Sequence, residues 1–218
     1  MDKRGKFIVI EGGDAAGKKT QANLALAKLQ QTTTTAFFDF PRYEQSMSGK
    51  IVRDALDGKF GDFRNLDSHL ASLPYTLDRV AAGAAMWDAL SKGNVLCNRY
   101  TPSNSMYQGA KFADEQKQSQ FIEWLEKLEY EEHNLPRPSI LIYLHVPFDV
   151  SQKLMEGRQK DQHEQDVAYL ERVVELYLRV ASRRADWGII ECVKDGELMS
   201  REEIHEKVMS LITAHLAS

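Results

Sequence analysis

A glycine-rich segment near the N-terminus has the residue types and spacing that bind phosphate. Four residues separate Gly12 from the pair Gly17-Lys18. Small residues let backbone N–H groups wrap around an anion, the following helix adds partial positive charge, and the lysine reaches the terminal phosphates. We therefore predict a phosphate-binding loop, or P-loop, with these nucleotide-binding residues: Gly12, Gly13, Asp14, Ala15, Ala16, Gly17, Lys18, Lys19 and Thr20.

The segments on either side of this loop have the composition that a P-loop needs. Phe7–Ile10 is a short apolar run, rich in β-branched residues, which is typical of a buried strand. Residues 21–29 favour a helix. The alternative is an ordinary glycine-rich turn, but a strand before the loop and a helix after it form the context that favours a P-loop.

The residue after the P-loop lysine departs from the usual pattern. A Ser or Thr normally stands there and ligates Mg²⁺, whereas this chain has Lys19 and then Thr20. A lysine cannot ligate Mg²⁺, although it can bind phosphate. The sequence therefore leaves open how a metal ion is held.

Apolar runs alternate with helical stretches along the rest of the chain, which is the pattern of an α/β fold with a mainly parallel sheet. Five strands are expected, at Phe7–Ile10, Ala36–Phe40, Val95–Asn98, Ile140–Val146 and Gly188–Val193. Ser200 and Glu203 form a capping box that predicts the start of the last helix. Since ligands of an open parallel sheet lie beyond the carboxyl ends of its strands, binding residues should follow the strands.

The composition narrows the class of protein. The chain has 218 residues, 43% hydrophobic and 28% charged, which fits one globular domain over residues 1–218. A net charge of −4 argues against a nucleic-acid binder. No apolar run is long enough to cross a bilayer, and no leader precedes Phe7, so we expect no membrane contact. Cys97 and Cys192 lie in apolar strand-like runs, as small buried side chains of a cytoplasmic protein do.

Four motifs in order give the chain a family resemblance: the P-loop, FPRY at 40–43, YTLDR at 75–79 and NRYTPSNSMYQG at 98–109. The chain resembles the thymidylate kinases of the P-loop nucleoside-monophosphate kinase superfamily, from about Lys6 to the last helix. The resemblance implies a three-layer α/β/α fold of P-loop NTPase type, with a five-stranded parallel sheet and a short lid at about 155–166. It further implies ATP and Mg²⁺ as cofactors, the reaction ATP + dTMP → ADP + dTDP in dTTP synthesis, and a homodimer formed by helix packing.

The resemblance also assigns the residues that bind the acceptor nucleotide. Phe40 and Pro41 would form a hydrophobic wall, and Arg42 and Tyr43 would contact the phosphate. The alternative for Arg42 is a solvated turn residue. Tyr107 would lie against the sugar, where a ribose 2′-hydroxyl collides with it.

The base would be bound from two helices. Tyr75 and Arg79, one helical turn apart, would stack on the base and bond its carbonyl group. The alternative places Tyr75 in the core and pairs Arg79 with Asp78 or another acid nearby. Asn104 would read the thymine edge, since an amide both donates and accepts; otherwise it is a residue of a helix N-terminal turn.

The resemblance implies a catalytic set made mainly of cations. Lys18 would contact the β- and γ-phosphates, Arg99 would clamp the acceptor phosphate, and Arg158 would come from the lid, with Lys160 as a further candidate. Asp14 faces the acceptor side, and with Thr20 and Glu164 it is a candidate for the metal shell; Glu164 also matches a position near the acceptor. Asn98 stands where the family has an aspartate, a second departure near the metal.

Other functions remain open from the residues alone. The nearest uses a different phosphoryl acceptor, either another deoxynucleotide or a deoxynucleoside, and the deoxynucleoside would need Glu11 as a base. From a different class comes a non-catalytic nucleotide-binding regulatory module, in which Lys19 and Asn98 mark lost catalysis. The acceptor-binding residues argue against such a module.

Overall fold

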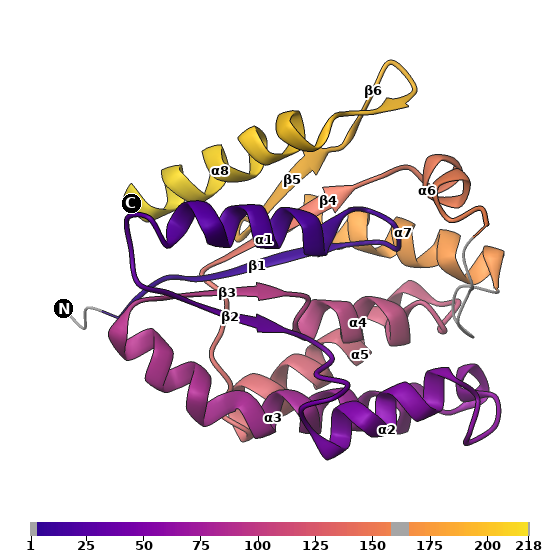
Figure 1. Cartoon of the computed structure of the whole chain (residues 1–218). Helices are drawn as coiled ribbons and strands as arrows, with labels where there is room; N and C mark the ends of the chain where they lie inside the picture. The colour runs from indigo at the N-terminus through magenta and orange to yellow at the C-terminus, as the bar shows by residue number, and fades with distance from the viewer. Residues whose placement is uncertain (1–3, 158–165, 218) are drawn as a thin grey trace.

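The structure, a computed structural model, describes residues 4–157 and 166–217, and its centre is a parallel sheet (Figure 1). The sheet consists of β1 (Phe7–Gly12), β2 (Thr35–Asp39), β3 (Asn94–Asn98), β4 (Ile140–His145) and β5 (Trp187–Glu191). Its five strands run in the order β2-β3-β1-β4-β5, and every neighbouring pair is parallel. The predicted α/β class with a five-stranded parallel sheet is confirmed.

The central strand β1 shows why these runs form a sheet covered on both faces. All six of its residues are buried. Because side chains alternate along a strand, Phe7 and Val9 enter one hydrophobic core, and Ile8 and Ile10 enter the other. The register pairs Val9 with Cys97 of β3 and with Leu141 of β4. Such continuous apolar runs are typical of a doubly covered parallel sheet.

Helices α1 (Lys18–Leu29) and α8 (Arg201–Ala217) cover one face of the sheet (Figure 1). The predicted capping box starts α8: the Ser200 N–H donates to Glu203 Oε2 at 2.8 Å, and the Glu203 N–H donates to Ser200 Oγ at 3.2 Å. This prediction is confirmed. Ile204, Val208 and Ile212 point from α8 into the core.

Four helices cover the other face, α3 (Ser68–Lys92), α4 (Thr101–Gly109), α5 (Glu115–Glu126) and α7 (Val167–Ser182). A π-helical segment, η2 (Lys127–Glu132), continues α5. Asp67 caps α3 by accepting hydrogen bonds from the backbone N–H groups of His69 and Leu70. Helix α3, which also contributes to the pocket described below, packs on the same core as the sheet.

Shorter elements connect or flank these layers (Figure 1). They are α2 (Met47–Leu56), η1 (Phe63–Asn65), α6 (Phe148–Leu154) and a hairpin of β6 (Val193–Lys194) and β7 (Glu197–Leu198). The fifth strand was expected to run to Val193, but it ends at Glu191, and the hairpin follows. Within the described ranges, no helix has both the length and the apolar composition of a membrane span.

Candidate active site

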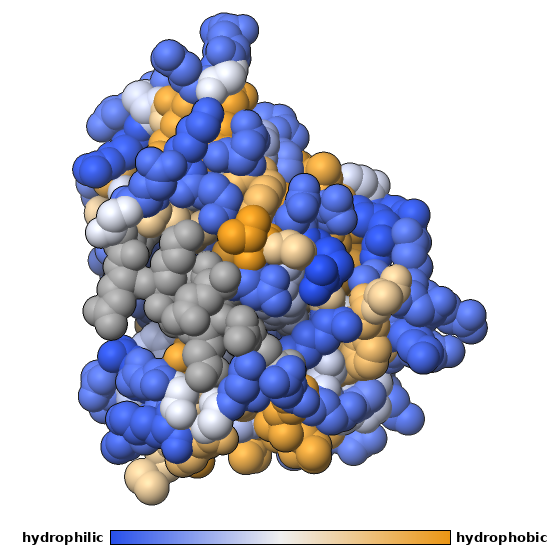
Figure 2. Space-filling model, turned by 90° about the vertical axis from the view of Figure 1, so that its right-hand side faces the viewer, coloured by the Kyte–Doolittle hydropathy of each residue, from blue (hydrophilic) through white to orange (hydrophobic). Residues whose placement is uncertain are grey.

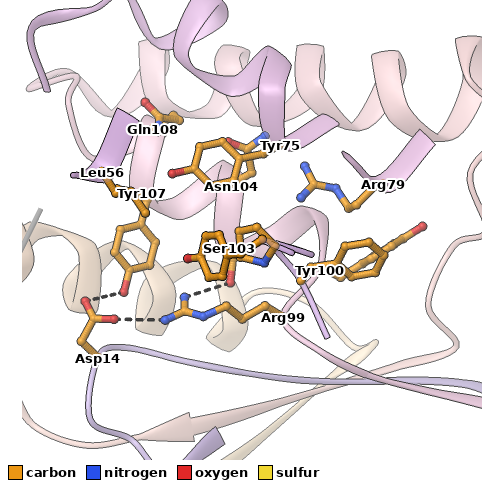
Figure 3. Close-up of a pocket in the computed structure, with 13 residues that line it drawn as sticks. Asp14, Leu56, Tyr75, Arg79, Arg99, Tyr100, Ser103, Asn104, Tyr107 and Gln108 are labelled. Carbon is orange, nitrogen blue, oxygen red and sulfur yellow. Dashed lines mark hydrogen bonds and ion pairs between the residues drawn. The ribbon is translucent and has the colours of Figure 1, made fainter. Parts of the chain in front are cut away.

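A pocket opens beyond the carboxyl ends of the strands, where this kind of sheet places its ligands (Figure 3). It encloses about 580 Å³ of space, part of which is open to solvent. The P-loop, the segment after β2, and helices α2, α3 and α4 contribute to its walls. The lining residues are Asp14, Phe40, Pro41, Tyr43, Leu56, Tyr75, Arg79, Arg99, Tyr100, Ser103, Asn104, Tyr107 and Gln108.

The P-loop is shaped by glycines at two positions. A Cβ on Gly12 would lie 2.9 Å from the carbonyl oxygen of Leu144, so only glycine fits beside β4. Gly17 has a φ of 74° and precedes the first turn of α1. Lys18 is 7% exposed and donates from Nζ to the Gly13 carbonyl. The lysine thus lies over the loop, whose sequence and position before a helix are suited to bind an anion.

Asp14 joins this loop to the acceptor pocket. Its carboxylate accepts from Arg99 Nη2 at 3.1 Å and from the Tyr107 hydroxyl at 2.6 Å (Figure 3). Burial alone would raise the pKa of Asp14, but the charges of Arg99 and Lys18 outweigh it and lower the pKa below its usual value. Asp14 is therefore an anion near neutral pH.

Arg99 owes its direction to a turn built around Glu11. Its φ is 60°, in the left-handed region, and its N–H donates to the Ile10 carbonyl at 3.0 Å. The Glu11 carboxylate accepts from the backbone N–H of Tyr100 at 2.8 Å and from the Ser103 hydroxyl at 2.7 Å. These bonds hold a backbone conformation that a non-glycine residue rarely adopts. Burial raises the pKa of Glu11 above its usual value.

The opposite end of the pocket contains a buried ion pair. Arg79 donates from Nε to Glu129 Oε2 at 2.7 Å and from Nη2 to Oε1 at 2.5 Å. Burial would raise the pKa of Glu129, but the charge and hydrogen bonds of Arg79 outweigh it and lower the pKa. Arg79 thus lines the pocket and also pairs with an acid, which combines the two alternatives that the sequence suggested.

Two amide side chains of α4 offer acceptors at this pocket. The Asn104 amide nitrogen donates to the Ser72 carbonyl at 3.1 Å, which fixes the amide. Asn104 Oδ1 and Gln108 Oε1 are buried and have no hydrogen-bond partner among the described residues. Gln108 was missed by the sequence analysis, although its position one helical turn after Asn104 is a usable signal.

Aromatic rings form much of the remaining wall. Phe40 lies near Tyr100, with 5.8 Å between ring centroids, and Tyr75 lies 6.4 Å from Phe63. The Arg53 guanidinium sits 4.4 Å from the centre of the Tyr43 ring. Leu56, at the end of α2, also lines the pocket and was not predicted. Flat apolar walls of this kind suit a planar ring.

Arg42 lies outside the pocket lining. Its Nε donates to Asp78 Oδ1 at 3.0 Å and its Nη2 to the Asp78 carbonyl at 2.7 Å. These bonds tie the segment after β2 to α3. A contact between Arg42 and a substrate phosphate stays a prediction.

The two departures from the usual P-loop pattern lie in one network. Lys19 Nζ is 3.1 Å from Asp39 Oδ2, and Asn98 Nδ2 donates to Asp39 Oδ1 at 2.6 Å. Lys19 thus neutralises a carboxylate at the end of β2. Asn98 Oδ1 is buried without a partner in the described part of the chain.

The oxygen atoms near the P-loop could ligate a hard cation, although they do not surround it completely. Among the described residues, no three His, Cys, Asp or Glu side chains gather in a metal-binding arrangement. Mg²⁺ at phosphoryl-transfer sites keeps several waters and uses one or two carboxylates plus substrate phosphates. Asp14, with about four acceptor positions and two hydrogen bonds, and the exposed Thr20 hydroxyl fit this pattern.

The predicted lid residues Arg158 and Glu164, together with Lys160, lie outside the described residues. Helix α7 starts beyond them, where the Asp166 side chain accepts from the Tyr169 N–H at 3.0 Å. The roles of Arg158 and Glu164 stay predictions.

Comparisons with known proteins show the family of the chain. The family model described as thymidylate kinase matches residues 10–206. The chain is 30% identical to the thymidylate kinase of Mycobacterium tuberculosis, over 84% of this chain and 87% of that protein. It is 29% identical to the probable thymidylate kinase of Methanocaldococcus jannaschii, over 94% of this chain and 95% of that protein.

A solved structure supports the fold. The thymidylate kinase from Candida albicans superposes with a TM-score of 0.77 at 22% identity, over 97% of this chain and 92% of that one. The two chains therefore share the same overall fold.

Proposed function

The chain belongs to the thymidylate kinase family, and we propose that it transfers the γ-phosphate of ATP to dTMP, giving ADP and dTDP. It is a nucleoside-monophosphate kinase in one catalytic domain, with a lid at about 155–166. The P-loop binds ATP, and the pocket of Figure 3 binds dTMP. The observation that carries the proposal is the pocket itself, which combines a base-reading end and a phosphate-binding end.

The base-reading end is complementary to thymine. Thymine offers O4 as an acceptor and N3–H as a donor, whereas cytosine offers an amino donor and an acceptor at these positions. Arg79 can only donate, and the Asn104 amide is fixed with Oδ1 as a buried acceptor. Thymine therefore satisfies both groups, whereas cytosine leaves both without a partner and is rejected. Gln108 Oε1 adds a second acceptor nearby.

The phosphate-binding end lies beside the P-loop. Arg99 Nη2 is 3.1 Å from Asp14, so the cation that clamps the acceptor phosphate is held within reach of the donor loop. Tyr107 packs at the same end and gives the preference for a deoxy sugar. Phe40 and Pro41 form the wall, with Tyr43 at the phosphate and Tyr75 stacked on the base.

Transfer needs positioning and charge stabilisation more than proton transfer. The dTMP phosphate is already ionised, so its oxygen attacks the γ-phosphorus in line without a general base. Lys18 contacts the β- and γ-phosphates, Arg99 stabilises the acceptor phosphate, and Arg158 reaches the transferred group when the lid closes. Asp14 orients Arg99 through their hydrogen bond.

Mg²⁺ accompanies ATP in this proposal and, when bound, neutralises and orients the β- and γ-phosphates. Asp14, Thr20 and Glu164 are its proposed protein ligands. Lys19 takes no part as a ligand, because its ammonium has no lone pair and pairs with Asp39.

Helices α2 and α3 carry the proposed homodimer interface. Leu70, Leu73 and Leu77 form one stripe on α3 and are 55%, 38% and 51% exposed, and Met47 of α2 is 80% exposed. Figure 2 views the face at the carboxyl ends of the strands and shows hydrophobic residues along its lower edge, where Figure 1 places both helices. A second copy that covers this stripe removes it from water. Leu73→Glu should convert a dimer into a monomer in sedimentation velocity, whereas an unchanged mass would exclude this interface.

The unpaired, buried thiols of Cys97 and Cys192 agree with the cytoplasmic location that we propose for the enzyme.

The direct test is release of ADP from Mg–ATP in the presence of dTMP, dUMP, UMP, dCMP or thymidine. We expect the highest kcat/KM with dTMP and no turnover of thymidine. Arg99→Ala should abolish most of the turnover, whereas Arg137→Ala, a change at a surface arginine, should not. Turnover of thymidine alone would refute the acceptor assignment. Tight ATP binding without turnover would instead indicate a regulatory nucleotide-binding module.

A further inference from the structure

We propose that Glu129 is the positioning residue that sets base specificity, because it orients Arg79 with one guanidinium nitrogen toward the acceptor base. The inference rests on the proposed function, since it assumes a pyrimidine nucleotide in the pocket. Glu129 does not line the pocket. Its action on a bound nucleotide is therefore indirect, and Arg79 is the lining residue to which it binds.

Glu129 lies in the π-helical segment η2, and its side chain is buried in the interior. The His133 N–H donates to the Leu128 carbonyl at 3.0 Å, a bond to the fifth preceding residue that belongs to a π-helix. Neighbouring Glu131 and Glu132 are exposed, whereas Glu129 is 0% exposed. A carboxylate is costly to bury unless it is paired and hydrogen-bonded, so this burial points to a specific role.

Each oxygen of Glu129 accepts two hydrogen bonds. Oε1 accepts from Arg79 Nη2 and from the Thr76 hydroxyl at 2.7 Å, and Oε2 accepts from Arg79 Nε and from the Thr101 hydroxyl at 2.6 Å. With four donors the carboxylate is saturated, so it can neither rotate nor bind a ligand. Its remaining effect on the site is to fix the guanidinium.

The fixed guanidinium keeps one nitrogen for the pocket. Nε and Nη2 of Arg79 are bound to Glu129, and Nη1 makes no hydrogen bond to another described residue. In Figure 3 the guanidinium of Arg79 points toward the part of the pocket that contains Asn104. Arg79 therefore presents a rigid donor to the base edge. A rigid donor rejects an exocyclic amino group more strongly than a mobile one, which could turn away.

The network also links the two ends of the pocket. Thr101 begins α4, two residues after the phosphate-clamping Arg99, and it donates to the same carboxylate as Arg79. Glu129 thereby sets the distance between the base-reading arginine and the start of the helix that carries Asn104. Loss of the Glu129 carboxylate should therefore change the preference between acceptor nucleotides more than it changes KM for ATP.

The experiment compares Glu129→Gln with the wild type in kcat and KM for dTMP, dUMP and dCMP. We expect KM for dTMP to rise and the preference for dTMP over dCMP to fall, each on the order of tenfold, while KM for ATP stays within about twofold. Glu126→Gln is the matched control, since Glu126 pairs with Arg184 at 2.5 Å one turn earlier and outside the pocket lining. It should leave the preference unchanged. A Glu129→Gln variant with wild-type preference would overturn the proposal.

A mutant cycle keeps the test valid if the single variant folds poorly. The cycle compares Arg79→Met with the double variant Arg79→Met/Glu129→Met. The double variant contains no unpaired carboxylate, and replacing both members of a buried pair is usually tolerated. If Glu129 acts through Arg79, the double variant has the same base preference as Arg79→Met. A further loss in the double would refute this mechanism. Failure of the wild type to phosphorylate dTMP would instead refute the proposed function.

Discussion

Two carboxylates, Glu11 and Glu129, flank the acceptor pocket and are both 0% exposed, yet their environments differ. Glu129 binds a guanidinium directly, and its pKa is lowered. Glu11 accepts from backbone N–H groups and hydroxyls, and burial raises its pKa. One carboxylate orients a charge, whereas the other shapes a turn.

The difference shows how a site can use the same residue type for two tasks. At the base end, the cation must stay still to select a hydrogen-bond pattern, so it is locked to Glu129. At the phosphate end, Arg99 must be available to an anion, so the buried Glu11 shapes its backbone and leaves the guanidinium with Asp14 at the pocket wall. Four predictions test this contrast.

The largest effect is expected from removing the two arginines separately. Arg99→Ala should lower kcat on the order of 100-fold or more, because the proposed role of Arg99 is to stabilise charge at the transferring group. Arg79→Ala should act mainly on KM for dTMP, since the proposed contact of Arg79 is with the base and not with the reacting phosphate. Steady-state kinetics with saturating Mg–ATP separates the two. Equal changes in kcat from both variants would contradict the division of tasks.

The two carboxylates should give opposite pH profiles of stability. Because the pKa of Glu129 is lowered, its contribution is complete above the usual pKa of 4.5 and is lost as pH falls through the lowered value. The free energy of unfolding of the wild type should thus exceed that of Glu129→Gln by about 3 kcal/mol at neutral pH and by less in acid.

Glu11 should behave in the reverse manner. Because the pKa of Glu11 is raised, its contribution to stability is complete below pH 4.5 and is lost as pH rises through the raised value. The free energy of unfolding of Glu11→Gln should therefore increase relative to that of the wild type toward neutral pH. Urea unfolding of both variants at a series of pH values provides the measurement. Parallel profiles would show that the two environments do not differ as described.

A smaller effect is expected where a carboxylate is absent. Asn98→Asp adds a negative charge beside Asp39, which already pairs with Lys19. The added charge attracts a cation, so the Mg²⁺ concentration for half-maximal activity should fall roughly two- to fivefold. A titration of activity with Mg²⁺ checks this, with Asn98→Ser as the neutral control. An unchanged concentration would indicate that Lys19 neutralises the added charge, and a rise would contradict the prediction.

The smallest effect is expected from Tyr107→Phe, which removes one hydrogen bond to Asp14. A hydrogen bond to a charged group contributes about 1.5–3 kcal/mol, so the variant should lose a comparable amount of stability. Selection against UMP should persist, because the ring that excludes the ribose hydroxyl remains. A comparison of kcat/KM for dUMP and UMP checks this, and equal values would move sugar selection elsewhere.

The sequence was sufficient for the parts of the molecule with local signals. Runs of consecutive apolar residues predicted the strands, and Ser200 with Glu203 predicted the start of α8. Most residues assigned to the acceptor line the same pocket, because each follows a strand end or lies one turn from another such residue. Arg42 is an exception, since its partner Asp78 lies on another element.

Features that depend on distant contacts could not be read from the chain. Glu129 stands among exposed acids and reads as part of a solvated face, and its partner Arg79 is 50 residues away. By contrast, the hairpin after β5 had a local signal in Asp195-Gly196, which has positive φ at both residues and follows the run predicted as one strand up to Val193.

The two unpartnered amide oxygens of α4 have a consequence for inhibitor design. Asn104 Oδ1 and Gln108 Oε1 are buried acceptors that need a donor from whatever fills the pocket. A flat aromatic compound that packs well between the rings but lacks N–H groups would keep both oxygens away from water without compensation, a penalty of about 1–3 kcal/mol for each. Scaffolds for this pocket should therefore be ranked by their donors toward α4 before their apolar area.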